Sequence, residues 1–184
     1  IAGDQQASLL GQACVRPGLG KITFGTGGML DVCTGDRPDF TGRGRNGTHP
    51  LVLWRDAART VWGVEAVMLS AGTNVEWLRD DLGIIGDAAE SEAVAASVAD
   101  SDGVTYVPAL LGLGTPHWDY GARGTLLGLT RGSTSAHVVR AVLEGVAQRG
   151  ADLVEAAEAD CGLTLGTLRI DGGMAANSVF VQAL

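Results

Sequence analysis

The segment that most constrains the fold is Ile22–Val32, which reads Ile-Thr-Phe-Gly-Thr-Gly-Gly-Met-Leu-Asp-Val. Strand-forming residues flank Gly25-Thr26-Gly27-Gly28, and this pattern predicts a β-hairpin with a glycine turn. Glycines accept the positive φ angles that tight hairpins demand, so we expect such angles here. A turn without Cβ atoms also lets its backbone N–H groups and the Thr26 hydroxyl approach an anion. Taken alone, the segment fits an ordinary hairpin without a ligand better than an anion site, because short glycine motifs often occur without a ligand.

The composition narrows the classes of function. The 184 residues fit one domain or part of a larger protein, and 46% hydrophobic residues suffice for a packed core. Glycine accounts for 28 residues, about twice the usual share of roughly 7%, without a short period. A net charge of −8 argues against nucleic acid or a membrane surface as the main partner, because both need a basic face.

The cysteines indicate the cellular compartment of the protein, and the chain ends indicate whether the sequence is a fragment. Cys14, Cys33 and Cys161 are odd in number and lack metal-ligand spacing, so we expect no disulfide framework, no zinc site and a cytoplasmic protein. We find no signal peptide and no apolar run that could cross a bilayer. The chain begins at Ile1 without a methionine and stops at Leu184 within an apolar run, so we expect a fragment.

Periodicity and turn residues predict an α/β domain with a mixed sheet. We expect strands at 50–54, 60–69, 104–111 and 165–170, and helices at 72–82, 87–99, 134–160 and 176–184. Gly162 is the expected stop of the long helix. Asp87 and Glu90 have the spacing of a capping box, which predicts structural roles for both carboxylates.

A second glycine site follows the last predicted strand. Asp171-Gly172-Gly173 separates this strand from a helix, where glycines let a ligand lie against the backbone. Asn177 stands one helical turn further on and can reach the same ligand. The alternative is a simple strand-to-helix turn with Asn177 on the surface. A Rossmann dinucleotide site is disfavoured, because the glycines do not form GxGxxG.

Asp4 is the first candidate for proton transfer. A carboxylate at a helix start beside Gln5 and Gln6 can accept a hydroxyl proton while the amides orient the alcohol. The alternative is that Asp4 is an N-cap without a catalytic role. His117 and His137 lack partners at metal-ligand spacing, and we expect both to be solvated or core histidines.

These segments, in this order, resemble the FGGY family of carbohydrate kinases. The most specific match is Gly124-Thr-Leu-Leu-Gly-Leu129 followed by His137-Val-Val-Arg-Ala-Val-Leu-Glu144. The similarity extends from Ile1-Ala-Gly-Asp-Gln-Gln6 to Asp171-Gly-Gly173. It implies an actin-like ATPase (ribonuclease H-like) fold, whose two lobes close on ATP, Mg²⁺ and a polyol. Residues 1–16 would end the first lobe, and residues 17–184 would form the second, truncated at its C-terminal end.

The resemblance also implies residue roles. Asp4 would be the base that takes the proton of the accepting hydroxyl and, with phosphates, a candidate ligand of Mg²⁺. Gln5 and Met29 would lie on the polyol side. The implied nucleotide-binding residues are Thr26, Gly72, Glu76, Gly173 and Asn177. Family members that act on glycerol usually have glutamine at position 76 and an aromatic residue at position 29.

The implied reaction is transfer of the ATP γ-phosphate to a terminal hydroxyl of a small polyol. Glycerol, giving glycerol 3-phosphate, is the first candidate, and another polyol, a ketose or a sugar acid stays open. A non-catalytic nucleotide-binding module with an actin-like scaffold is a second alternative. We expect this chain to be inactive alone, and the whole protein is a candidate homo-oligomer.

Overall fold

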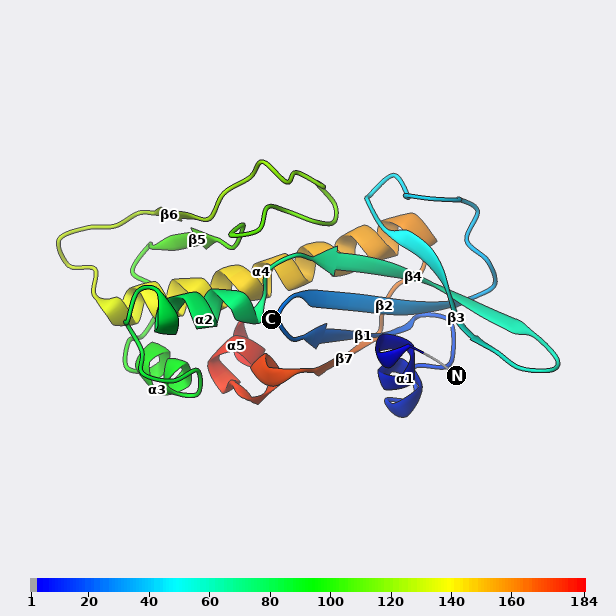
Figure 1. Cartoon of the computed structure of the whole chain (residues 1–184), viewed down its shortest axis with the longest axis horizontal. Coiled ribbons are helices and arrows are strands. Elements are labelled where there is room, and N and C mark those ends of the chain that lie inside the picture. The colour runs from blue at the N-terminus through cyan, green and yellow to red at the C-terminus, as the bar shows by residue number, and fades with distance from the viewer. Residues whose placement is uncertain (1–2) are drawn as a thin grey trace.

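The computed structural model describes residues 3–184, so Ile1 and Ala2 lie outside the described residues. Its centre is a five-stranded sheet with the order β3-β4-β2-β1-β7 (Figure 1). β1 and β7 run parallel and the other neighbours are antiparallel, so the sheet is mixed, as predicted. The strands are β1 (Leu19–Phe24), β2 (Gly28–Gly35), β3 (His49–Arg55), β4 (Thr60–Met68) and β7 (Thr167–Asp171).

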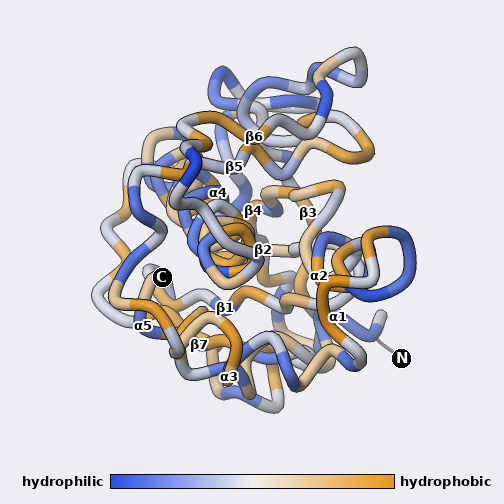
Figure 2. The backbone as a smooth tube through the Cα atoms, turned by 90° about the vertical axis from the view of Figure 1, so that its left-hand side faces the viewer, coloured by the Kyte–Doolittle hydropathy of each residue, from blue (hydrophilic) through white to orange (hydrophobic). Residues whose placement is uncertain are grey.

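Helices cover both faces of this sheet, and the long α4 is central in both views (Figures 1 and 2). The helices are α1 (Asp4–Gly11), α2 (Gly72–Asp80), α3 (Glu90–Ala96), α4 (Ser135–Cys161), the 3-10 helix η1 (Gly173–Ala176) and α5 (Ser178–Ala183). β5 (Thr105–Val107) and β6 (Thr125–Leu127) form a separate two-stranded sheet on the far side of α4 (Figure 2). Within residues 3–184, no helix combines the length and apolarity needed to span a membrane.

The apolar face of the sheet packs against α4. Side chains alternate between faces along a strand, so Ile22 and Phe24 of β1 share one face with Leu30 and Val32 of β2. All four are buried in the main core together with valines and leucines of α4. The Phe24 ring also meets Phe180 of α5 edge-on, with 4.8 Å between ring centroids. This core fixes the ends of β1 and β7, where the two glycine turns begin.

The opposite face carries charged side chains in one register. We call Arg169, Lys21, Asp31, Glu65 and His49 the polar row, because they are neighbours across β7, β1, β2, β4 and β3. α1 lies over this face, and its Leu9 packs in a small second core with Cys14 and Cys33. The two faces of one sheet therefore differ in chemistry.

Two predicted elements are shorter than expected. The strand expected at 104–111 ends at Val107, because Pro108 has no N–H to donate and Gly112 turns with a φ of 86°. The helix expected from Asp87 begins at Glu90.

The predicted capping box of α3 does not form, because Ala89 is the N-cap. Asp87 accepts from the Ala89 N–H at 2.6 Å, and Glu90 accepts from the Gly86 N–H at 2.6 Å. Both carboxylates are structural, as predicted, but they brace the preceding turn.

The long helix matches its prediction closely. α4 runs over Ser135–Cys161 and ends at Gly162, whose φ of 67° is the left-handed conformation of a helix stop. His137 completes a capping box with Thr134, because its Nδ1 accepts from the Thr134 N–H at 3.0 Å. His137 is therefore a helix cap rather than a solvated or core residue, and His117 is exposed.

Candidate functional site

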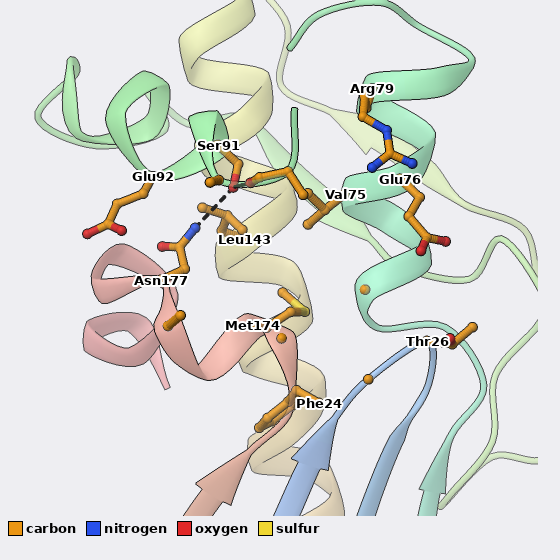
Figure 3. A pocket seen from close by; sticks show the side chains of 16 residues that line it. Phe24, Thr26, Val75, Glu76, Arg79, Ser91, Glu92, Leu143, Met174 and Asn177 are labelled. Atoms are coloured by element: carbon orange, nitrogen blue, oxygen red, sulfur yellow. Dashed lines mark hydrogen bonds between the residues drawn. The ribbon is translucent and has the colours of Figure 1, made fainter. Parts of the chain in front are cut away.

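A cavity of about 320 Å³ opens at the edge of the sheet where both glycine turns emerge (Figure 3). We call it the glycine-turn cavity. Its walls come from the hairpin turn, α2, the start of α3, one turn of α4 and η1. All five residues that the resemblance implies for the nucleotide line it: Thr26, Gly72, Glu76, Gly173 and Asn177. Residues far apart in the sequence are thus gathered in one place.

The hairpin turn is held from below by the start of α2. The Gly25 carbonyl accepts from the Gly72 N–H at 2.8 Å, and the Thr26 carbonyl accepts from the Ala71 N–H at 2.8 Å. The N–H groups of Thr26 and Gly27, by contrast, donate to no other group among residues 3–184. These two donors and the exposed Thr26 hydroxyl can serve an anionic ligand.

The predicted positive φ angles are wrong for this turn, since Gly25, Gly27 and Gly28 all lie outside that region. Glycine is required at Gly27 and Gly72 because neighbouring backbone atoms lie too close for a side chain, and not because of a positive φ angle. A Cβ on Gly27 would lie 2.7 Å from the Met68 carbonyl oxygen, and a Cβ on Gly72 would lie 2.6 Å from the Gly25 carbonyl oxygen. The turn and α2 approach each other too closely for a side chain.

The second glycine turn follows β7. Gly172 has a φ of 88°, and a Cβ there would lie 2.3 Å from the Phe24 carbonyl oxygen. Gly173 differs, because a Cβ on it would meet no protein atom within 4 Å. Gly172 is therefore required by the fold, whereas Gly173 leaves open space on the cavity side.

Asn177 is the N-cap of α5. Its Oδ1 accepts from the Phe180 N–H at 3.0 Å, and its Nδ2 donates to the Ser91 hydroxyl of α3 at 3.1 Å (Figure 3). The side chain both caps a helix and lines the cavity, so Asn177 is not simply a surface residue of a strand-to-helix turn. Ser91 and Glu92 join it in the wall, and Glu92 also accepts from the Ser178 hydroxyl.

The pairing of Ser91 with Asn177 joins residues 86 positions apart, and no spacing rule would have found it. Sequence reasoning therefore missed the α3 side of the cavity. A serine one residue into a helix was the one local sign, and a cap explains it equally well.

The opposite wall is α2, which presents Glu76 and Arg79 (Figure 3). Glu76 is exposed. Arg79 donates to both oxygens of Asp80, at 2.6 and 2.7 Å. These hydrogen bonds raise the pKa of Arg79 and lower the pKa of Asp80. Sequence reasoning missed Arg79.

Asp4, Gln5 and Met29 lie outside the glycine-turn cavity, on the α1 face of the sheet. Met29 pairs with Thr23 and Val67 in the sheet, and this register puts it on the same face as Lys21 and Asp31. Asp4 is exposed and starts α1. The structure thus separates the residues implied for the two substrates.

Asp4 is not the N-cap, because Gly3 occupies that position and Asp4 is the first helical residue. Its Oδ1 accepts one hydrogen bond, at 2.9 Å, from the Gln5 N–H. Gln5 is fixed by the buried Lys21 ammonium, which donates to its Oε1. Among residues 3–184, no further donor contacts the exposed Asp4 carboxylate, so acceptor positions of this side chain are open to a ligand.

Comparisons with known proteins place this geometry in a family. Residues 20–184 match the C-terminal domain of the FGGY family of carbohydrate kinases. The chain is 50% identical to glycerol kinase of Gloeobacter violaceus and 52% identical to glycerol kinase of Trichlorobacter lovleyi, each over 182 residues. Both alignments cover 99% of this chain but 36% of the relative, so the chain spans about a third of these proteins.

Solved structures agree. Plasmodium falciparum glycerol kinase with ADP superposes with a TM-score of 0.88 at 33% identity, over 98% of this chain and 36% of that one. Xylulose kinase from Rhodospirillum rubrum has a TM-score of 0.78 at 26% identity, over 99% and 36%. The predicted actin-like ATPase fold is confirmed by these neighbours. The chain belongs to the FGGY family of carbohydrate kinases.

Proposed function

We propose that the full-length protein transfers the γ-phosphate of ATP to a terminal hydroxyl of glycerol, giving glycerol 3-phosphate. The observation that carries the kinase proposal is the gathering of both glycine turns around one cavity. About half of the residues are identical to those of glycerol kinases along almost the whole chain, which supports glycerol as the acceptor. Residues 1–16 would end the first lobe and residues 17–184 would form the second, and the match of residues 20–184 to the C-terminal domain of the family supports this division.

The nucleotide would lie in the glycine-turn cavity. Phosphates fit the free N–H groups of Thr26 and Gly27, and the backbone at Gly173 is open to a ligand. The apolar walls from Val75, Leu143 and Met174 suit a purine ring. Glu76 would accept from the ribose hydroxyls, since a carboxylate is repelled by the phosphates.

The polyol would lie on the α1 face, between Asp4, Gln5 and Met29. In the reaction, the hydroxyl oxygen bonds to the γ-phosphorus and its proton passes to the Asp4 carboxylate. The bond from the γ-phosphorus to the bridging oxygen breaks, and ADP leaves with that electron pair. Such a loose transition state needs mainly positioning and charge neutralisation, which the fixed Gln5 side chain and the backbone donors supply.

Mg²⁺ would neutralise phosphate charge when bound. Among residues 3–184, no three acidic, histidine or cysteine side chains come close enough to form a metal site. The ion would be held mainly by phosphate oxygens, with Asp4 as a candidate ligand from this chain. The cytoplasmic location and the homo-oligomer remain predictions.

The test is an ATP-consumption assay of the full-length protein with glycerol, pentuloses, hexuloses and sugar acids. We expect kcat/KM to be highest for glycerol. A different preferred acceptor would refute the substrate and keep the kinase. Nucleotide binding without turnover of any acceptor would favour the non-catalytic module.

Asp4→Asn in the full-length protein tests the base. The amide keeps the shape but accepts no proton, so kcat should fall on the order of 10²–10⁴-fold. The affinity for ATP, measured by calorimetry, should change less than about threefold, because Asp4 lies outside the cavity. Near-normal turnover would reduce Asp4 to a helix-terminal residue.

A further inference from the structure

α1 is held on the sheet mainly by polar contacts. Leu9 is its one buried residue among those described, whereas two polar side chains of α1 and that of its C-cap residue Gln12 form hydrogen bonds with the strands below. Gln5 accepts from Lys21, and Ser8 and Gln12 donate to Asp171 at the end of β7. The side-chain hydrogen bonds are directional, so they fix the position of α1 more closely than one leucine contact can.

Asp171 carries two of these three contacts. Its Oδ2 accepts from Ser8 Oγ at 2.5 Å and from Gln12 Nε2 at 2.6 Å. Burial alone would raise the pKa of Asp171, but hydrogen bonds, that of Ser8 first, lower its pKa below the usual range. The carboxylate is therefore charged at neutral pH, which strengthens both bonds. The two contacts join residues 163 and 159 positions apart in the chain.

Asp171 lies between the second glycine turn and α1, so its hydrogen bonds join these two segments. Asp171 is the last residue of β7, and the next residues are Gly172 and Gly173 of the cavity turn. On the other side, Ser8 stands one helical turn after Asp4. A single carboxylate thus connects the turn at the cavity to the helix that carries the proposed base.

We propose that Asp171 is a positioning residue that couples the Gly172–Gly173 turn to α1, so that nucleotide in the cavity fixes the place of Asp4. This inference rests on the proposed function. Bound nucleotide restricts the motion of the Gly172–Gly173 turn, which directly follows Asp171 in the chain. The charged hydrogen bonds of Asp171 to Ser8 and Gln12 then restrict the motion of α1. Misplacing a reacting group by about 1 Å can cost on the order of 10²-fold in rate, so loss of the coupling should lower kcat measurably.

A double-mutant cycle in the full-length protein tests the kinetic part. We expect Asp171→Ala to lower kcat by about 10²-fold, with KM for ATP changed less than about threefold. Ser8→Ala should lower kcat by about tenfold alone and by less than about twofold in the Asp171→Ala background, because its partner is already gone. Independent effects that multiply would overturn the proposal.

Asp160→Ala is the matched control. Asp160 is also a carboxylate that ties distant segments, since it accepts from the backbone and side chains of Asn46 and Thr48. We expect it to lower the melting temperature about as much as Asp171→Ala does while leaving kcat within about twofold. Equal losses of kcat in the two variants would show that Asp171 acts only through stability, and would overturn the proposal.

Hydrogen exchange gives a readout that needs no turnover. ADP should slow amide exchange in residues 4–12 of the full-length protein, and Asp171→Ala should abolish this slowing while ADP still binds. Binding of ADP without slowed exchange in α1, or slowing that persists in the variant, overturns the coupling alone. A protein that binds no ADP overturns the proposed function and the coupling with it.

Discussion

Glu76 lines the glycine-turn cavity at a position where the family resemblance leads us to expect glutamine. It is exposed on α2, and Arg79, one turn further on, is already engaged by Asp80. A carboxylate close to a triphosphate would be repelled, whereas ribose hydroxyls are donors that a carboxylate accepts as well as an amide does. The substitution of an acid for an amide is therefore tolerable on the ribose side only.

Glu76→Gln tests this placement. We expect the affinity for ATP, measured by calorimetry, to be equal or slightly tighter, with little dependence on pH in either form. Glu155→Gln, which changes an exposed carboxylate on α4 outside the cavity, is the matched control. A loss of affinity beyond about tenfold, roughly 1.4 kcal/mol, would mean that the carboxylate has a specific role such as metal binding.

Lys21 and Asp31 form an ion pair with no exposed surface, with 3.1 Å between Nζ and Oδ2. Burial raises the pKa of Asp31, and the Lys21 ammonium opposes this shift. Lys21→Met would leave the carboxylate buried without its partner, which costs about 3–5 kcal/mol in the free energy of unfolding.

Adding Asp31→Leu to Lys21→Met should recover most of this loss, because a matched apolar pair has no charge to desolvate. Urea unfolding of the two variants measures the difference. If the double variant is no more stable than Lys21→Met, the hydrogen bonds of Lys21 to Gln5 and Thr23, rather than the ion pair, dominate its contribution.

At the scale of elements, the turn after β7 places two glycines with opposite roles side by side. Gly172→Ala puts a Cβ against the Phe24 carbonyl and strains a left-handed backbone, so it should destabilise the fold by several kcal/mol. A Cβ at position 173 would meet no protein atom within 4 Å, so Gly173→Val should keep its melting temperature while ATP affinity falls by at least about tenfold. Unchanged ATP affinity in folded Gly173→Val would remove this turn from the proposed nucleotide site.

Sequence patterns predicted the helices and strands whose formation depends mainly on neighbouring residues in the chain. The β1–β2 hairpin follows from strand formers around glycines, and α4 follows from an apolar stripe that ends at Gly162. The strand expected at 104–111 is confined to Thr105–Val107, because Pro108 within the apolar run ends the pairing. The contacts of Asp171 with α1 could not be predicted, because they depend on β7 pairing beside β1, and strand order is not encoded in spacing.

At the scale of the whole molecule, the two faces of the central sheet have different roles. Its apolar face and α4 hold the main core, while its polar face and α1 carry the residues proposed for the polyol and for proton transfer. Tyr106 of β5 joins the outer layer to this core. Its hydroxyl donates to Asn74 Oδ1 at 2.8 Å, its ring stacks on Trp77, and its carbonyl approaches Gly145 so closely that only glycine fits there.

This burial makes the stability of the molecule sensitive to alkali. Burial raises the pKa of Tyr106 to about 12, whereas the unfolded chain has a tyrosine pKa of about 10. The folded-state pKa is raised, so its contribution is fully present below pH 10 and is lost as the pH rises towards 12. Two units correspond to roughly 2–3 kcal/mol in the free energy of unfolding.

Tyr106→Phe removes the ionising group, so its stability should fall less than that of the unmodified chain between pH 10 and pH 12. Urea unfolding followed by circular dichroism at several pH values measures this slope. Tyr120→Phe is the matched control, because Tyr120 is 63% exposed and its removal should leave the slope unchanged. An equal alkaline decline in Tyr106→Phe would place the pH-sensitive group elsewhere and would mean that the β5 layer opens before Tyr106 ionises.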